Sequence, residues 1–470
     1  MNRESGRPAL ELLSSHWLSL AGAALVTTAG FSWLFVLPMQ VRGRAGNPYI
    51  GLIVFIAIPV VFCLGLALIP IGAYLGRRRI RDGLANVLDR KTALRRLATL
   101  LAGATFANLV IGTQGTYRAV EHMDTVQFCG QSCHVMQPEF VSHDNAPHAQ
   151  VSCVECHVAP GATGWVKSKM AGVRQLRDVV FNRYPRPIPS AMESGRLVPA
   201  SETCEQCHWP EKQISARLRI IPGYKDDEAN SASQTVLMMP VGGGKAGGIH
   251  GTHFGPGVEI RYAAADLKRQ TIPLVQYRNR NSNESRTYLA QDATPESVRN
   301  LPQFDMQCVD CHNRPTHAFA LPERAVNRAL ASGALSSTLP YIKKKSVELL
   351  NTAYAGSDEA AQKIRNGIVE FYREKYPDVY AQRSSDVTRA ADSVVSIYNR
   401  NVFPDLKVTW GTYPNNLGHT DFPGCFRCHD EAHATSGKQT ITQDCSVCHN
   451  ALAVDEATPE VLKTLGLAKP

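Results

Sequence analysis

The chain has 470 residues, enough for two or three domains, and carries a formal net charge of +9. The basic residues are unevenly placed, and the sequence contains no signature of a DNA- or RNA-binding module. The charge therefore does not indicate a nucleic acid as the partner.

Three long stretches near the N-terminus contain no charged residue: Trp17 to Gln40, Pro48 to Gly76 and Leu97 to Tyr117. A helix needs roughly 20 apolar residues to cross a bilayer, so each stretch predicts a transmembrane helix. The first could also be a cleavable signal peptide. A second long stretch follows almost at once and no small-residue cleavage site is evident, which favours a retained helix.

The loop between the second and third stretches contains eight Lys or Arg residues and only Asp82 and Asp89 as acidic residues. Basic loops stay on the cytoplasmic side of a membrane. The residues after Tyr117 are therefore predicted to lie in the periplasm of a bacterial inner-membrane protein.

Twelve of the 13 cysteines form six repeated motifs in which a histidine directly follows the second cysteine. The motifs are Cys129/Cys133/His134, Cys153/Cys156/His157, Cys204/Cys207/His208, Cys308/Cys311/His312, Cys425/Cys428/His429 and Cys445/Cys448/His449. Five are CxxCH, whereas the first is CxxxCH. One such motif could be a zinc site, a redox dithiol or a disulfide.

Six copies indicate six c-type haems, because CxxCH binds haem through both thiols and places the histidine under the iron. Such haems are attached outside the bacterial cytoplasm, which agrees with the predicted orientation. The remaining cysteine, Cys63, lies in an apolar stretch and is predicted to be a small buried side chain.

Beyond the first motifs, GWVKSKMAGVRQLRDVVF has helical apolar spacing and a basic opposite face, which predicts a helix near the membrane surface. The next 80 residues contain short β-like runs, a hairpin turn at NRNSNES and the glycine-rich IHGTHFG, which we expect in a loop of the β insertion. Residues 322–400 have helical patterns, and TPEVLKTLG predicts a short final helix with a polar cap.

The expected fold is mainly α, with three transmembrane helices and an irregular, haem-packed periplasmic domain that carries a small β insertion. The expected parts are a membrane anchor (1–117), a trihaem domain (118–222), the β insertion with the fourth motif (223–330), a helical segment (331–408) and a C-terminal dihaem module (409–470).

A haem iron with two strong axial ligands transfers electrons, whereas an open iron can bind a substrate. The candidate second ligands are Met136, His148, His250, His253, His317, His419 and His433. His122 and His143 are expected to have no such role. This number of candidate second ligands predicts that most or all irons have two ligands, and it does not exclude one open iron.

The third hydrophobic stretch, CGQSCHVMQPEF, SHDNAPHAQVSCVECH and TCEQCHWP together resemble the NapC/NirT family of membrane-anchored multihaem quinol dehydrogenases. The resemblance covers roughly Leu97 to Pro210. This chain departs from the short family form, which has one anchor helix and four haems, in its first motif, its two further spans and its six motifs. The second half resembles enlarged forms from bacteria that respire metals.

The resemblance implies an inner-membrane cytochrome that oxidises menaquinol in anaerobic respiration. It passes the electrons to periplasmic cytochromes or reductases, or towards extracellular acceptors. It also implies that Met136 is a ligand of the first haem, that His148 binds a neighbouring haem, and that Lys167 or Lys169 lies in the quinol pocket. Glu139 and Asp178 are candidate bases by their position. The chain could be a homo- or hetero-oligomer.

Two other functions fit the same motifs. One is a terminal reductase with one open haem, and the other is a membrane conduit that receives electrons from another protein.

Overall fold

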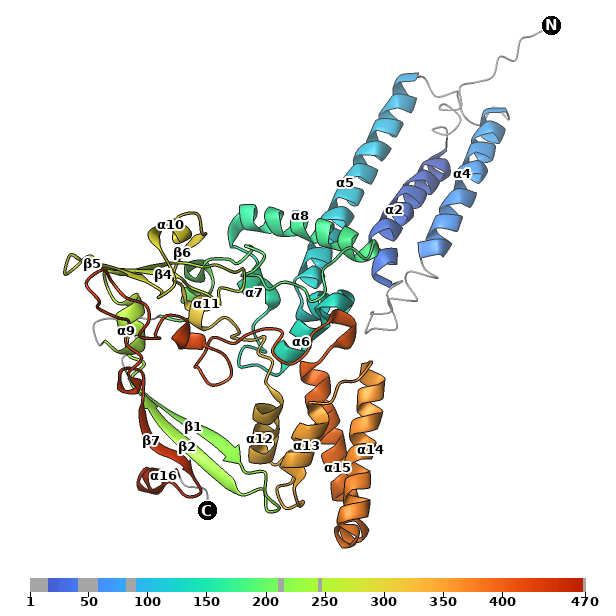
Figure 1. The fold of residues 1–470 in the computed structure, drawn as a ribbon. Helices are drawn as coiled ribbons and strands as arrows, with labels where there is room; N and C mark the ends of the chain where they lie inside the picture. The colour runs from blue at the N-terminus through green and yellow to red at the C-terminus, as the bar shows by residue number, and fades with distance from the viewer. Residues whose placement is uncertain (1–15, 41–57, 82–89, 210–214, 244–246, 468–470) are drawn as a thin grey trace. The chain divides into compact units, whose positions relative to one another are not determined.

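The computed structural model describes residues 16–40, 58–81, 90–209, 215–243 and 247–467. It divides into two compact units, Met1–Asp124 and Thr125–Pro470 (Figure 1). The predicted subdivision of residues 118–470 into four parts stays a prediction.

The N-terminal unit contains three long helices, α2 (Trp17–Gln40), α4 (Ile58–Arg81) and α5 (Arg90–Met123). The backbones of α2 and α4 approach closely at glycines. A Cβ atom added to Gly22 would lie 2.6 Å from the carbonyl oxygen of Gly65. Such contacts between small residues are a common basis of helix packing in membranes.

Two segments, Ile58–Arg78 and Leu94–Met123, are long and apolar enough to cross a membrane. The first predicted span forms α2. Among the described side chains of α2, Trp17–Ser32 forms an apolar stretch that is shorter than a membrane crossing. The membrane crossing by α2 therefore stays a prediction.

The prediction that Cys63 is buried is wrong, because its side chain is exposed on α4. Apolar residues can cover the whole surface of a helix that faces lipid. An apolar stretch therefore does not place a side chain inside the protein.

The second unit contains more helix than strand. Its longer helices are α6 (Gln137–Asp144), α8 (Gly161–Val180), α9 (Gly248–Phe254), α12 (Pro322–Ser332), α13 (Ile342–Leu350), α14 (Ser357–Lys375) and α15 (Pro377–Asn401), and α10 (Pro295–Val298) and α16 (Glu460–Thr464) are short. The helices predicted after the second motif, over residues 322–400 and at the C-terminus are confirmed. The predicted polar cap of α16 is wrong, because its cap residue is Pro459. IHGTHFG was expected as a loop but forms α9.

Two antiparallel sheets form the β component. The first has the order β1 (Arg217–Tyr224), β2 (Ala232–Met239), β7 (Asn450–Glu456), and the second has the order β5 (Glu284–Leu289), β4 (Leu274–Asn279), β3 (Val258–Ala263), β6 (Gln303–Asp305). The predicted hairpin is confirmed by the pairing of Asn279 with Glu284. The sequence did not predict β7, which joins the first sheet from the C-terminal end of the chain (Figure 1).

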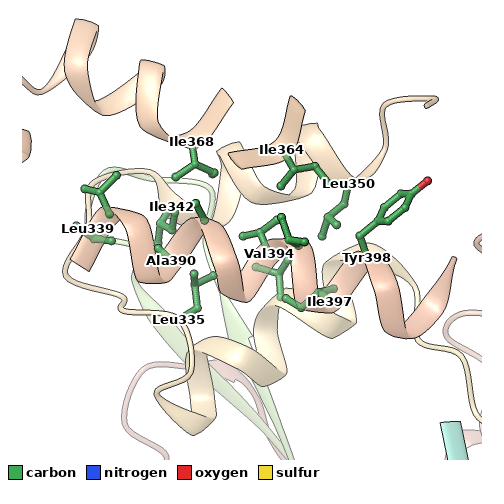
Figure 2. Close-up of a cluster of buried hydrophobic side chains, with 14 of the residues drawn as sticks. Leu335, Leu339, Ile342, Leu350, Ile364, Ile368, Ala390, Val394, Ile397 and Tyr398 are labelled. Carbon is green, nitrogen blue, oxygen red and sulfur yellow. The ribbon is translucent and has the colours of Figure 1, made fainter. Parts of the chain in front are cut away.

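Helices α12 to α15 form a lobe with its own apolar core (Figure 2). Its centre includes Leu339, Ile342, Ile364, Ile368 and Val394, which have no exposed surface. Removing such side chains from water is the main source of the lobe's stability.

The lobe is tied to the haem-motif region at the end of α15. There the side-chain oxygen of Asn401 accepts a hydrogen bond of 2.8 Å from the backbone N–H of Ala320, three residues after His317. The lobe therefore holds the chain that follows the fourth motif.

Candidate haem sites

Five motifs form one tight helical turn each. These turns are α7 (Cys153–His157), η5 (Cys204–Gln206), α11 (Cys308–Cys311), η9 (Gly424–Arg427) and η10 (Cys445–Val447). In the last four motifs the backbone N–H of the histidine donates to the carbonyl of the first cysteine, over 2.8 to 3.0 Å. Both thiols and the imidazole therefore leave the backbone within a single turn, as attachment to one haem requires.

The first motif forms a π-helical turn, η2 (Phe128–Ser132). A π-helix closes its hydrogen bonds over one more residue than an α-helix, so the additional residue between Cys129 and Cys133 is accommodated locally. A Cβ atom on Gly130 would collide with the ring of Phe140 on α6. The turn therefore depends on glycine at this position.

The thiols of the six motifs differ in their exposure. Cys207 of the third motif is exposed, as are Cys156, Cys425 and Cys445, whereas the other motif cysteines are half-buried. The backbone N–H of Cys207 donates to the carbonyl of Cys204 over 3.2 Å, which keeps both thiols of the motif on one turn. Attachment of the third haem through Cys207 stays a prediction.

The histidines of the second to sixth motifs each face a second histidine ring. The ring centroids are 6.0 Å apart in His148–His208, 6.2 Å in His157–His317, 6.3 Å in His250–His312, 5.9 Å in His253–His429 and 6.1 Å in His419–His449. Two metal–nitrogen bonds of about 2 Å, with roughly 1 Å from each nitrogen to its ring centre, give a separation of about 6 Å. The residues therefore fit five irons, each held between two imidazoles.

Hydrogen bonds at Nδ1 support this fit. Nδ1 lies 3.0 Å from the carbonyl oxygen of Glu139 in His317, 2.7 Å from that of Ile249 in His253 and 2.9 Å from that of Thr442 in His429. Metal-binding histidines usually donate their second ring N–H to such an acceptor. In these three rings Nε2 stays available for iron.

Burial also favours the neutral imidazole that binds metals. Burial lowers the pKa of His157, His250, His253 and His312, and it lowers the pKa of His317 to about 3.

His433 does not face a motif histidine among the described residues. Its Nδ1 lies 2.9 Å from Asp430 Oδ1, and its Nε2 lies 2.6 Å from the carbonyl oxygen of Ile272. Both ring nitrogens are thus used within the protein. This arrangement does not favour the predicted role of His433 as an iron ligand, and the ring that faces His429 of the fifth motif is that of His253, another of the predicted ligands.

The two histidines expected to be bystanders are placed differently. His143 lies 6.3 Å from His317, but its Nε2 is 2.9 Å from the carbonyl oxygen of Val151. His122 lies in α5, in the N-terminal unit.

No second histidine ring faces His134 in the described part of the chain. Met136, the predicted ligand, ends the short turn η3 (His134–Met136) directly after the motif cysteines. Its side chain is half-buried.

The thiols show that the first four motifs are neighbours in sequence order. A hydrogen bond from Cys129 lowers the pKa of Cys153 to about 7. Burial raises the pKa of Cys156 and of Cys308. In both cases the charge of the Cys204 thiol is the second largest cause of the raised pKa. The second motif therefore adjoins the first and third, and the third adjoins the fourth.

The order continues to the end of the chain. Burial raises the pKa of Cys311 to about 12, with Cys425 the next contributor. Burial raises the pKa of Cys448, again with Cys425 next. Thiols of consecutive motifs thus influence one another from the first motif to the sixth.

A buried ion pair joins the fourth motif to its surroundings. Arg269 Nη1 lies 3.0 Å from Asp310 Oδ1, and the hydroxyl of Tyr262 donates to the same oxygen. The guanidinium of Arg427, between the cysteines of the fifth motif, donates to the carbonyl of Asp310 over 2.6 Å. Asp310 and Arg427 therefore fix the fourth and fifth motifs relative to each other.

Helix α8 has an exposed apolar face within the second unit. Its members are Val166, Met170, Val173, Leu176 and Val180, which are 52 to 68% exposed. Lys169 is three residues from Val166 and four from Val173, so it lies on this face. Lys167 lies on the opposite side, with Asp178 eleven residues further on.

The four candidate quinol-site residues are therefore distributed over different surfaces. The ammonium of Lys169 lies 5.6 Å from the ring centre of Trp165, and Asp178 accepts two hydrogen bonds from Arg177. Glu139 lies on α6, and burial raises the pKa of its carboxyl.

Residues 91–208 match the NapC/NirT cytochrome c family, N-terminal region. Over 446 residues the chain is 37% identical to the cytochrome c-type protein ImcH of Geobacter sulfurreducens, and the alignment covers 93% of this chain and 87% of ImcH. Over 116 residues it is 32% identical to the cytochrome c nitrite reductase subunit NrfH of Nitratidesulfovibrio vulgaris, covering 24% of this chain and 69% of NrfH. No solved structure matches the chain.

The full-length similarity to ImcH and the family match over the first three motifs agree with the haem-binding geometry. The chain therefore belongs to the NapC/NirT family of c-type cytochromes, as a membrane-anchored multihaem electron-transport protein.

Proposed function

We propose that this protein binds six c-type haems, oxidises menaquinol at the periplasmic face of the inner membrane and delivers the electrons to a periplasmic cytochrome or reductase. The observation that carries the proposal is the set of five facing histidine pairs at the second to sixth motifs. Bound haem supplies an iron that is reversibly reduced by one electron.

The histidine pairs favour electron transfer over a terminal reductase. Each pair would occupy both axial positions of a bound iron and would leave that iron no place for a substrate. His312, His429 and His449 of the second half all face a second histidine. The reductase alternative required an open iron in that half.

Lys169 is our candidate for the quinol-binding lysine. Quinol is an amphiphile that arrives from the membrane, and the apolar face of α8 offers a surface that can contact lipid. The Lys169 ammonium on this face donates a hydrogen bond to a quinol oxygen, whereas Lys167 on the polar side faces water. Oxidation of quinol releases two electrons and two protons, and Glu139 and Asp178 remain the candidate proton acceptors.

Mixing the oxidised protein with a menaquinol analogue without oxygen tests this function. We expect rapid growth of the reduced haem absorption band, and Lys169→Met should slow it by about ten- to a hundredfold, because a hydrogen bond to a charged group contributes about 1.5–3 kcal/mol. Lys167→Met is the matched control and should react at the normal rate. Equal rates in both variants would argue against the Lys169 site. Reduction by dithionite but not by the quinol would favour a conduit fed by another protein.

A further inference from the structure

The chain after the fourth motif carries a half-buried cation, Arg314, whose one buried nitrogen has no acceptor among the described residues. Arg314 lies two residues after His312, and its Nε atom is buried. Within the described ranges, its guanidinium forms no hydrogen bond or ion pair with the protein and only stacks on Tyr413, at 4.3 Å from the ring centre. A buried donor atom without an acceptor is costly, so an anionic ligand that accepts from Nε would stabilise this site.

The carboxylates nearest to Arg314 do not provide that acceptor. Glu139 and Glu193 both influence Arg314 electrostatically, but neither forms an ion pair with it. Glu193 accepts a hydrogen bond from the backbone of Ser190. Glu139 Oε2 is itself buried without a partner.

Two further facts locate the site at which a ligand of Arg314 would bind. The hydroxyl of Thr316, two residues after Arg314, is also buried without a partner. Thr316 directly precedes His317, and Arg314 lies three residues before it, in the segment that places the Nδ1 atom of His317 3.0 Å from the carbonyl oxygen of Glu139. The two unsatisfied donors thus belong to the surroundings of the His157–His317 pair.

We propose that Arg314 and Thr316 bind a propionate carboxylate of the haem whose iron is held by His157 and His317. An arginine matches a carboxylate with two parallel hydrogen bonds, and a threonine hydroxyl can donate a third. The contact anchors the second haem to the chain that follows the fourth motif. The positive charge of Arg314 disfavours the ferric state of that haem. This inference rests on the proposed function for the assignment of the iron to His157 and His317.

The test is a redox titration of the full-length holoprotein followed by electron paramagnetic resonance. His317→Ala identifies the low-spin signal of this haem by its loss. In Arg314→Gln that signal should titrate at a more negative potential, by about a tenfold change in the equilibrium constant, or about 59 mV for one electron. Arg389→Gln removes the same charge from an exposed position on α15 and should leave the potential unchanged.

The resonance Raman bands of the propionates provide a second measurement, which depends on hydrogen bonding and not on charge alone. They should change in Arg314→Gln and Thr316→Val. They should also change in Arg314→Lys, which keeps the charge but loses the planar fork. Arg314→Lys carries the test if Arg314→Gln does not mature.

Two results would overturn the proposal: unchanged propionate bands, or a potential shift no larger than in Arg389→Gln. The bands respond to Arg314 whichever histidine binds the iron. If every low-spin signal survives in His317→Ala, the pairing in the proposed function has failed, and the bands still report on Arg314.

Discussion

In the variant His253→Ala we expect the low-spin electron paramagnetic resonance signal of one haem to disappear. In His433→Ala every low-spin signal should remain. The ring of His253 faces His429 at 5.9 Å, and its Nδ1–carbonyl hydrogen bond leaves Nε2 for iron. Removal of this ring opens one axial position and makes that iron high-spin. The measurement is electron paramagnetic resonance of the oxidised protein.

His433→Ala is the matched control, because both histidines lie near the fifth motif. It removes the hydrogen bonds to Asp430 and to the Ile272 carbonyl, which should lower the free energy of unfolding by about 1–3 kcal/mol. A high-spin signal in His433→Ala, together with an unchanged spectrum in His253→Ala, would reverse the assignment.

The second large effect is expected for Asp310→Ala. This change removes the partner of Arg269, whose side chain is only 13% exposed. Loss of one partner from a buried ion pair typically costs about 3–5 kcal/mol, and the free energy of unfolding should fall by a similar amount. Guanidinium unfolding of the holoprotein, followed by circular dichroism, measures it.

The comparison for Asp310→Ala is Asp392→Ala, which breaks the exposed pair between Arg365 and Asp392. Exposed pairs contribute about 0–1 kcal/mol, so this variant should unfold almost as the original protein does. Equal losses in the two variants would show that the buried ion pair between Arg269 and Asp310 stabilises the protein no more than an exposed pair does.

Local patterns in the sequence were sufficient for much of this fold. The haem motifs, the helix α8 and the hairpin between β4 and β5 each depend on residues that are close in the chain. Strand β7 could not be predicted, because its partner β2 lies more than 200 residues earlier. Its pairing depends on the tertiary fold and not on a local turn.

The second iron ligands show the same limit. Closeness to a motif suggested His433, but the ring that faces His429 of the fifth motif is that of His253, 176 residues upstream. The choice depends on which ring nitrogen is engaged by a carbonyl, and spacing along the chain does not contain that information. The glycine-rich surroundings of His250 and His253 likewise concealed a short helix, α9.

The most direct test of the proposed electron path uses the double variant Cys425→Ala/Cys428→Ala, which lacks the fifth haem. Because the sixth motif adjoins the fifth, the haem at Cys445 and Cys448 should then be isolated from the haems of the first four motifs. On mixing with a menaquinol analogue, we predict that the haems of the first four motifs are reduced at the normal rate, while the last stays oxidised until dithionite is added. Reduction of the last haem at the same rate as the others would contradict a single path in motif order.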